Sequence, residues 1–347
     1  MRRRSFARNP QVTRLAVLIV LVVLVFSALS PSVYPTPLNF QSLGYSVPEI
    51  AVLALAVALA MRTSGIDLSI VATANLAAIS AAKFYLSVGG ESANGIGMFL
   101  AAVGIAVGVG LACGAVNGAV IAWVGISPIL ATLATMQVFN GVAVLWTGGK
   151  AQYGFPDTFL QLGTLTIALV PVSLLLTVVA TAWVWWLVNR TGLGLRITLV
   201  GANAMAGRYS GIDERAVLLR TYLLSGLLAG LAGILIAAKS ASASPDYGGS
   251  YVLLAIVIAV LGGTDPAGGK GSVVGVALAA LALQMLESGF NFLRVNPLIY
   301  QIVQGAVLLV VMILELRRGR LSRLFGGVSA SRRGEPRNSA TEPAQPG

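Results

Sequence analysis

Residues 44–62 read GYSVPEIAVLALAVALAMR, a segment that is entirely apolar from Ile50 to Met61. A helix needs about 20 mostly apolar residues to cross the hydrocarbon core of a bilayer. The 347-residue chain repeats this pattern along most of its length, with 56% hydrophobic and only 10% charged residues. A soluble domain typically carries about 25% charged residues. The composition therefore predicts an all-α polytopic membrane protein.

Ten stretches are long and apolar enough to be predicted as spans. Their ranges are 14–31, 44–62, 66–87, 96–124, 127–147, 165–188, 218–238, 251–263, 272–290 and 298–316. The stretch 251–263 is short and runs into LGGTDPAGGKG, so we expect a broken or re-entrant helix there. The spans predict three parts: a basic N-terminus (1–13), a transmembrane part (14–316) and a tail (317–347). The tail is polar and rich in Pro and Ser, which favours disorder.

The basic residues predict which side of the membrane each loop faces. With both termini cytoplasmic, 19 of the 23 Lys and Arg residues fall on the cytoplasmic side. Only Lys83, Lys150, Lys239 and Arg294 fall on the other side. The positive-inside rule therefore predicts cytoplasmic termini. The net charge of +11 then reflects these loops and contact with anionic membrane lipid, and we expect no nucleic acid as a partner.

Two residue counts exclude most enzyme classes. The chain has no His and a single Cys, Cys113, which excludes a Ser-His-Asp triad, an HExxH site and a CxxC redox pair. The stretch LGGTDPAGGKGS (261–272) is similar to a phosphate loop, but Gly271 stands where that loop needs Ser or Thr after Lys270. We expect instead a tight cytoplasmic turn between two close-packed helices. The chain is predicted to be no enzyme, with no cofactor and no metal site.

The largest internal hydrophilic segment, 189–217, falls on the predicted cytoplasmic side. Asn203 to Gly211 predicts a short amphipathic helix, with Asn203 as its N-cap and Gly211 as its stop. Apolar residues in the segment, such as Met205 and Tyr209, favour a docking surface over a solvated loop, because an exposed apolar patch usually marks a contact.

Small residues recur at a spacing of four, which lets helices approach closely. They are Gly104 and Gly108, then Gly110, Gly114 and Gly118, and later Gly226 and Gly230. This pattern predicts a compact helix bundle.

Polar side chains inside spans are costly and therefore indicate function. Neutral amides and hydroxyls suit a transient sugar-like or polyol solute better than an ion, which usually needs carboxylates at mid-membrane. Glu49 and Glu287 are predicted near span ends, and Asp67 is interpreted as a helix-start residue that can pair with Arg62. The candidate residues of a translocation path are Asn75, Asn117, Thr132, Thr135, Gln137, Asn140 and Glu287.

Several stretches, in a fixed order, resemble the permeases of bacterial monosaccharide ABC importers of the ribose/xylose/rhamnose type. They are SGIDLSIVATANLAA (64–78), GAVNGAVIAWVGISPILATLATM (114–136), GLGLRITLVGANAMAGRYSGI (192–212), GLLAGLAGILIAAKSASASPDYGGSY (226–251) and VLGGTDPAGGKGSVVG (260–275). The resemblance covers roughly residues 40–316. It implies about ten helices in a vitamin-B12-permease-like bundle with two related helix groups.

The resemblance also implies partners and a mechanism. Cytoplasmic ABC ATPase subunits bind the ATP, a periplasmic solute-binding protein delivers the sugar, and a second permease copy or a paralogue completes the pore. Transport proceeds by alternating access in the bacterial inner membrane. The segment 201–211 matches the family's coupling helix, which makes 189–217 the coupling segment of a permease domain at 14–316. The residues that this match assigns to ATPase coupling are Gly201, Asn203, Arg208, Ser210 and Gly211.

The chain departs from the family pattern at two places. Ser64 stands where the first motif usually has glycine, and the stretch around Val252 lacks a usual acidic residue. WTGGKAQYGFP (146–156) also resembles permeases for autoinducer-2. An autoinducer-2 permease and a branched-chain amino-acid permease therefore stay open as alternatives, and a secondary carrier is a more remote one.

Overall fold

The computed structural model describes residues 10–296, 298–302, 305–306 and 309. Residues 1–9, the tail 317–347 and most of the predicted span 298–316 lie outside the described residues. The chain divides into two units, Met1–Tyr300 and Gln301–Gly347, and the fold below is that of the first unit. Among the described residues, eight helices are long and apolar enough to cross a membrane, which confirms an all-α polytopic membrane protein.

The first half of the unit is a series of long helices. They are α1 (Pro10–Leu29), α2 (Pro37–Met61), α3 (Ile70–Ser87), α4 (Ile96–Ala119) and α5 (Pro128–Thr147), with a 3-10 turn η2 (Gly90–Ser92) and a π-helical turn η3 (Val120–Val124). The second half has shorter elements between its spans. They are α6 (Asp157–Thr164), β1 (Thr166–Ile167), β2 (Val170–Pro171), α7 (Val172–Arg190), α8 (Gly192–Ala202), α9 (Ala204–Tyr209), α10 (Glu214–Ser240), α11 (Tyr251–Leu261) and α12 (Val273–Phe292).

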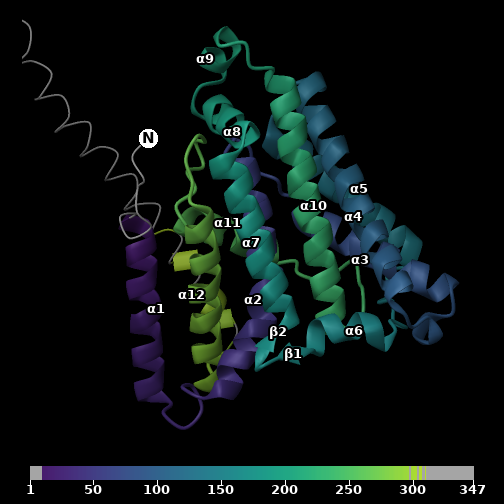
Figure 1. Cartoon of the computed structure of the whole chain (residues 1–347), viewed down its shortest axis with the longest axis vertical. Coiled ribbons are helices and arrows are strands. Elements are labelled where there is room, and N and C mark those ends of the chain that lie inside the picture. The colour runs from purple at the N-terminus through teal and green to yellow at the C-terminus, as the bar shows by residue number, and fades with distance from the viewer. Residues whose placement is uncertain (1–9, 297, 303–304, 307–308, 310–347) are drawn as a thin grey trace, which may run out of the picture. The chain divides into compact units, whose positions relative to one another are not determined.

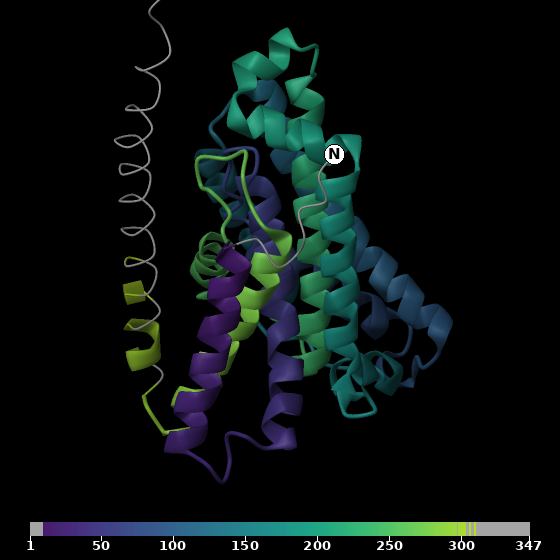
Figure 2. The same cartoon turned by 60° about the vertical axis from the view of Figure 1, so that its left-hand side comes forward.

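The two ends of the bundle are easily told apart (Figure 1). α8 and α9 lie at one end, and α6 with the β1–β2 hairpin lies at the other. We call these the α8–α9 end and the hairpin end. α1 packs against α12, and both views show the two helices side by side (Figure 2).

The core is built on α2 and α10. Every residue of α2 from Ile50 to Met61 is buried, as expected for a helix that is apolar on all sides. α10 packs against α4, α2 and α3. α2 begins at Pro37 after the N-cap Thr36, earlier than the predicted start at residue 44.

Glycines bring α4 and α10 into backbone contact. A Cβ added at Gly110 would collide with the carbonyl of Gly226, and one at Gly226 would collide with the carbonyl of Gly110. The close packing predicted from these glycines is confirmed. The same prediction is wrong for Gly104 and Gly108 within the described part of the chain, because no described residue of another helix lies within 4 Å of a Cβ added at either position.

Two predicted spans differ in the structure. The span predicted at 165–188 starts with a hairpin, in which Thr166 pairs with Pro171 and Ile167 with Val170, and only then continues as α7. The stretch 251–263 forms the 11-residue α11, which is too short for a full span and ends in a non-helical loop. A broken helix there agrees with this, and a re-entrant path stays a prediction. Gly262 after α11 packs directly on Gly275 of α12, which confirms the predicted close packing around this turn.

Candidate functional site

The short helix α9 has the caps that the sequence predicts. The Asn203 side-chain oxygen accepts a hydrogen bond from the backbone N–H of Ala206 at 3.0 Å. The helix ends at its C-cap Ser210, and Gly211 follows in the left-handed region with φ +74°. Met205 and Tyr209 are 69% and 88% exposed. α9 therefore presents two large apolar side chains outward from the α8–α9 end.

Gly201, in the last turn of α8, joins this end to the rest of the bundle. A Cβ at Gly201 would overlap the carbonyl of Arg62, so the two backbones are in direct contact. The Ser64 hydroxyl lies 2.9 Å from the carbonyl oxygen of Gly201 and 2.8 Å from that of Ala267. Three segments, 62–65, the end of α8 and the loop 262–272, therefore meet at one point.

Arg62 holds the same junction from the side of α2. Its Nη2 donates to the carbonyl oxygen of Gly271 at 2.6 Å, and its own carbonyl accepts from the N–H of Gly269 at 3.0 Å. Burial lowers the pKa of the Arg62 guanidinium to about 10, so it remains protonated at neutral pH. The predicted pair between Arg62 and Asp67 is wrong, because the loop 262–272 supplies the partners of Arg62.

A cavity of about 690 Å³ lies beside this junction. Its lining includes Ser64, Trp123, Ser127 and residues 200–204. Arg208 and Glu214 also line it and form an ion pair, with Nε 2.5 Å from Oε2. Three of the five predicted coupling residues, Gly201, Asn203 and Arg208, thus line one cavity at the α8–α9 end. Ser210 and Gly211 follow α9 and are not part of that lining.

A buried polar network runs from α10 to α5 through Asp67. Oδ2 of Asp67 accepts from the hydroxyl of Ser225 at 2.8 Å, and Oδ1 accepts from the hydroxyl of Ser69 at 2.7 Å. Asn117 of α4 donates to the Ser69 oxygen at 2.7 Å and accepts from the Thr135 hydroxyl at 2.6 Å. Burial raises the pKa of the Asp67 carboxyl in this loop between α2 and α3. Asp67 is therefore a hub that links four segments, and not only a helix-start residue.

Two other candidates of the predicted path also hold backbone in place. The Thr132 oxygen accepts from the N–H of Leu68 at 3.1 Å, which ties the same loop to α5. The side-chain amide of Asn75 donates to the carbonyls of Pro245 at 2.9 Å and Tyr247 at 2.8 Å. An amide on α3 thereby satisfies two carbonyls of the non-helical connection between α10 and α11, as backbone within a bundle requires.

The remaining predicted path residues are dispersed. Gln137 is exposed on α5, and Asn140 on the same helix is half-buried. Glu287 on α12 is half-buried and accepts from the side chain of Gln284 at 3.0 Å. The structure thus gathers Asn117, Thr132 and Thr135 around the loop between α2 and α3. Gln137 and Asn140 lie further along α5, and Asn75 and Glu287 lie on other helices.

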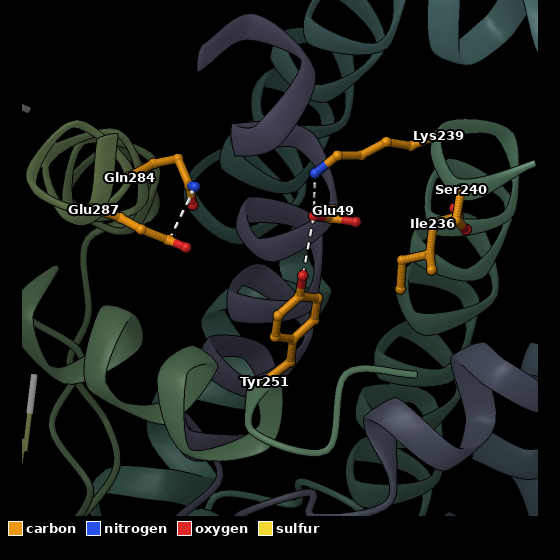
Figure 3. Close-up of polar contacts among 7 residues, drawn as sticks. All are labelled: Glu49, Ile236, Lys239, Ser240, Tyr251, Gln284 and Glu287. Atoms are coloured by element: carbon orange, nitrogen blue, oxygen red, sulfur yellow. Dashed lines mark hydrogen bonds and ion pairs between the residues drawn. The ribbon is translucent and has the colours of Figure 1, made fainter. Parts of the chain in front are cut away.

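A charged cluster near the hairpin end, formed by Glu49, Lys239 and Tyr251 (Figure 3), is not predicted by the sequence patterns. Glu49 lies in the middle of the 25-residue α2, and its Oε1 pairs with Nζ of Lys239 on α10 at 2.7 Å. The predicted position of Glu49 near a span end is wrong, because α2 starts earlier than its apolar run. The sequence Thr36-Pro37, an N-cap followed by proline at the first helical position, is the signal that could have placed this start.

The comparisons with known proteins agree on one family. The profile of the family described as branched-chain amino acid transport system / permease component matches residues 40–312. A D-allose transport system permease protein of Escherichia coli is 30% identical over 86% of this chain and 89% of its own length. Autoinducer 2 import system permease proteins of an Enterobacter species and of Photorhabdus temperata are 33% and 32% identical, over 86% of this chain and 91% and 89% of theirs. No solved structure matches the chain.

Proposed function

The chain belongs to the family of branched-chain amino acid transport system / permease components, and on this premise we propose that it imports a monosaccharide. In this proposal it is the membrane-spanning subunit of an ATP-driven importer of the bacterial inner membrane and has no ATPase site of its own. The observation that carries the proposal is the similarity over 86% of the chain to a permease named for D-allose and to permeases named for autoinducer 2. The family description keeps a branched-chain amino acid as the second candidate.

We assign ATPase coupling to the α8–α9 end, within the segment 189–217 of a permease domain at 14–316. Met205 and Tyr209 on α9 offer an apolar contact to a partner, and such exposed apolar side chains are typical of docking surfaces. Gly201 and Ser64 connect α8 to the end of α2. A displacement of α9 by a bound partner is therefore transmitted through α8 to the core helix α2. Gly211, in the left-handed region, sets the turn that follows α9.

The α8–α9 end is assigned to the cytoplasm, and with it both termini. Eight of the twelve Lys and Arg in the described residues lie toward that end, and the other four toward the hairpin end. This distribution follows the positive-inside rule. The loaded periplasmic binding protein then docks on the hairpin end.

The solute path is assigned to the face of α5 that a second permease copy, or a paralogue, completes. Gln137 is an exposed amide on a membrane-spanning helix, and a polar group facing lipid hydrocarbon lacks hydrogen-bond partners at a cost of several kcal/mol. Facing a water-filled path between two copies removes that cost. Asn140, one turn further along α5, extends the same polar face.

The test is a mild pull-down of the native complex followed by uptake competition. We expect a co-purifying ABC ATPase and a periplasmic binding protein, and ATP-dependent uptake that D-allose, D-ribose or L-rhamnose competes and leucine does not. Competition by leucine alone would instead support the amino-acid candidate. Solute flux in ATP-free vesicles, without any co-purifying ATPase, would identify a secondary carrier and refute the importer.

A double substitution tests the coupling assignment. Met205→Ser with Tyr209→Ser removes both exposed apolar side chains of α9 without touching the buried Gly207. We expect at least tenfold less ATPase in the pull-down at normal permease expression. Leu169→Ser is the matched control, because Leu169 is 69% exposed in the hairpin at the opposite end. Equal ATPase recovery from all three proteins refutes docking at α9.

A further inference from the structure

The charged cluster at the hairpin end is built from three helices and takes no part in the coupling or path assignments above. Glu49 comes from α2, Lys239 from α10 and Tyr251 from α11 (Figure 3). Nζ of Lys239 lies 2.7 Å and the hydroxyl of Tyr251 lies 3.2 Å from the same oxygen, Oε1 of Glu49. The Glu49 side chain is only 8% exposed, whereas that of Lys239 is 37% exposed. The cluster is thus buried on one side and open on the other.

The cluster borders a cavity of about 300 Å³. This volume is at the lower limit of the range of about 300–1,000 Å³ that is usual for small-molecule sites. Two aromatic rings, of Tyr247 and Tyr251, line the cavity together with Ser240 and Ile236. The Tyr247 hydroxyl shares a hydrogen bond of 2.5 Å with Ser242, so its ring is held in position. The cavity therefore combines charges, hydroxyls and ring faces in a space that fits a small solute.

Glu49 and Lys239 keep hydrogen-bonding atoms that no described residue uses. Both donors use Oε1 of Glu49, and within the described part of the chain no donor reaches Oε2. Figure 3 shows this second oxygen directed to the side of Ile236 and Ser240, which line the cavity. The ammonium group of Lys239 has three N–H donors, of which the described residues take one.

A purely structural role explains the cluster poorly. Replacing a buried ion pair by apolar residues is often neutral or stabilising, because the cost of desolvation rivals the attraction. Ionisable residues within membrane-spanning helices are rare and mark solute or ion pathways. Glu49 and Lys239 cancel each other's charge. The second carboxylate nearby, Glu287, accepts from Gln284 on α12 and is not among the residues that line the cavity. The pair that faces the cavity therefore favours neither an anion nor a cation.

We propose that Glu49, Lys239 and Tyr251 bind a neutral polyhydroxylated solute at the hairpin end, an inference that rests on the proposed sugar import. Oε2 of Glu49 accepts from solute hydroxyls, and the free N–H groups of Lys239 donate to solute oxygens. The rings of Tyr247 and Tyr251 pack against the C–H faces of the solute. Glu287 is bonded to Gln284 on α12, across from Glu49 (Figure 3), and is not needed for these contacts.

The experiment measures solute transported per ATP hydrolysed by the complete importer in proteoliposomes, with the binding protein present. The probe is whichever of D-allose, D-ribose and L-rhamnose the wild-type importer takes up. Glu49→Gln keeps the size of the side chain and removes its charge, and Tyr251→Phe removes one hydroxyl. Tyr45→Phe is the matched control on α2, because its hydroxyl donates to the carbonyl of Thr164 at 2.8 Å, outside the cavity.

We expect Glu49→Gln to lower the solute transported per ATP at least tenfold and Tyr251→Phe about threefold, with ATPase stimulation by the loaded binding protein within twofold of wild type. Tyr45→Phe should transport as much solute per ATP as the wild-type importer. The exchange Glu49→Lys with Lys239→Glu restores the ion pair but displaces the carboxylate, and we expect it to leave transport low.

Two outcomes overturn the site alone while wild-type sugar uptake stays intact. One is recovery of transport in the charge-exchanged protein, and the other is a parallel fall of transport, ATPase activity and melting temperature in Glu49→Gln. Either result assigns the cluster to helix packing. Absence of ATP-dependent sugar uptake by the wild-type importer refutes the proposed function and the site with it.

Discussion

Ser64 occupies a backbone conformation that suits glycine better. Its φ of +61° lies in the left-handed region, where a side chain costs about 1 kcal/mol or more. The resemblance to monosaccharide permeases places a glycine here, and the structure explains why the backbone accepts one. Serine compensates with its hydroxyl, which reaches the carbonyls of Gly201 and Ala267.

Ser64→Ala and Ser64→Gly should therefore differ in stability. Alanine keeps the backbone strain and loses the hydrogen bond, so we expect Ser64→Ala to lower the free energy of unfolding by about 1 kcal/mol. Glycine loses the same bond but relieves the strain, so we expect the free energy of unfolding of Ser64→Gly to lie within about 0.5 kcal/mol of the wild-type value. Thermal unfolding of the three purified proteins in detergent tests the order. An alanine variant more stable than the glycine variant contradicts this account of Ser64.

A substitution at Thr135 tests the contribution of the buried polar network to stability, again by thermal unfolding. Thr135→Val leaves the Asn117 oxygen without its 2.6 Å donor, and an unsatisfied buried acceptor costs about 1–3 kcal/mol. Thr221→Val is the control, because Thr221 is fully buried and its hydroxyl, among the described residues, bonds only to the carbonyl of Val217 within its own helix. We expect a clearly lower melting temperature for Thr135→Val than for Thr221→Val. Equal melting temperatures would show that the network adds nothing to stability.

Single residues show where sequence reasoning reaches its limit. The cost of polar groups in spans singles out Asn117 and Thr135 from the sequence alone, and the structure places them in hydrogen-bond contact. The role of Asp67 at the centre of this network is not predicted from the sequence. Its partners Ser69 and Ser225 follow no motif, and Ser225 is 158 residues away. Periodicity carries no information on which distant hydroxyl a carboxylate meets.

At the scale of elements, α4 and α10 pack backbone against backbone through their glycines. Gly226→Ala places a methyl group against the carbonyl of Gly110, and overpacking of this kind costs about 1–3 kcal/mol. Gly104→Ala adds the same methyl group where nothing lies within 4 Å, and alanine favours a helix over glycine by about 0.5–1 kcal/mol. We therefore expect a lower melting temperature for Gly226→Ala and no loss for Gly104→Ala. The opposite order would contradict the packing of α4 on α10.

Apolar runs predict the helices well and their ends less well. The run in α2 starts at Ile50, yet the helix starts at Pro37, because a cap and a proline set the start and the run does not. The hairpin before α7 is missed for a related reason: its residues are as apolar as a span, and only the left-handed Ala168 and Leu169 make the turn. Capping and turn geometry thus shift element boundaries that hydropathy cannot resolve.

At the scale of the molecule, the assignment of sides can be tested by labelling. Cys113 is buried and is the only cysteine, so Cys113→Ala gives a background for single cysteines. We expect a membrane-impermeant maleimide to label Leu169→Cys in intact spheroplasts and Tyr209→Cys only in inside-out vesicles. Leu169 lies in the hairpin and Tyr209 on α9, at opposite ends of the bundle. The reverse labelling pattern would place the hairpin end, and not the α8–α9 end, on the cytoplasmic side.

The family and the general architecture could be predicted from ordered motifs, but the cluster around Glu49 could not. Glu49 and Lys239 are 190 residues apart, and each alone looks like a charge near the end of a span. Only the packing of α2, α10 and α11 brings them together. Long-range pairing of this kind depends on how helices rotate against one another, which a single sequence does not encode in any local pattern.

The shortness of α11 has a consequence for biogenesis. Its 11 residues cover only about 16 Å, roughly half of the hydrocarbon core. Such a segment cannot partition into lipid by itself, since the backbone on either side of it would lack hydrogen-bond partners. We therefore expect the nascent chain to keep α11 beside α2, on which it packs in the folded bundle, until α12 has emerged from the ribosome. We expect insertion of this region to be cooperative, because α11 packs on α12 as well as on α2, and a chain truncated before α12 should leave α11 without part of its packing surface.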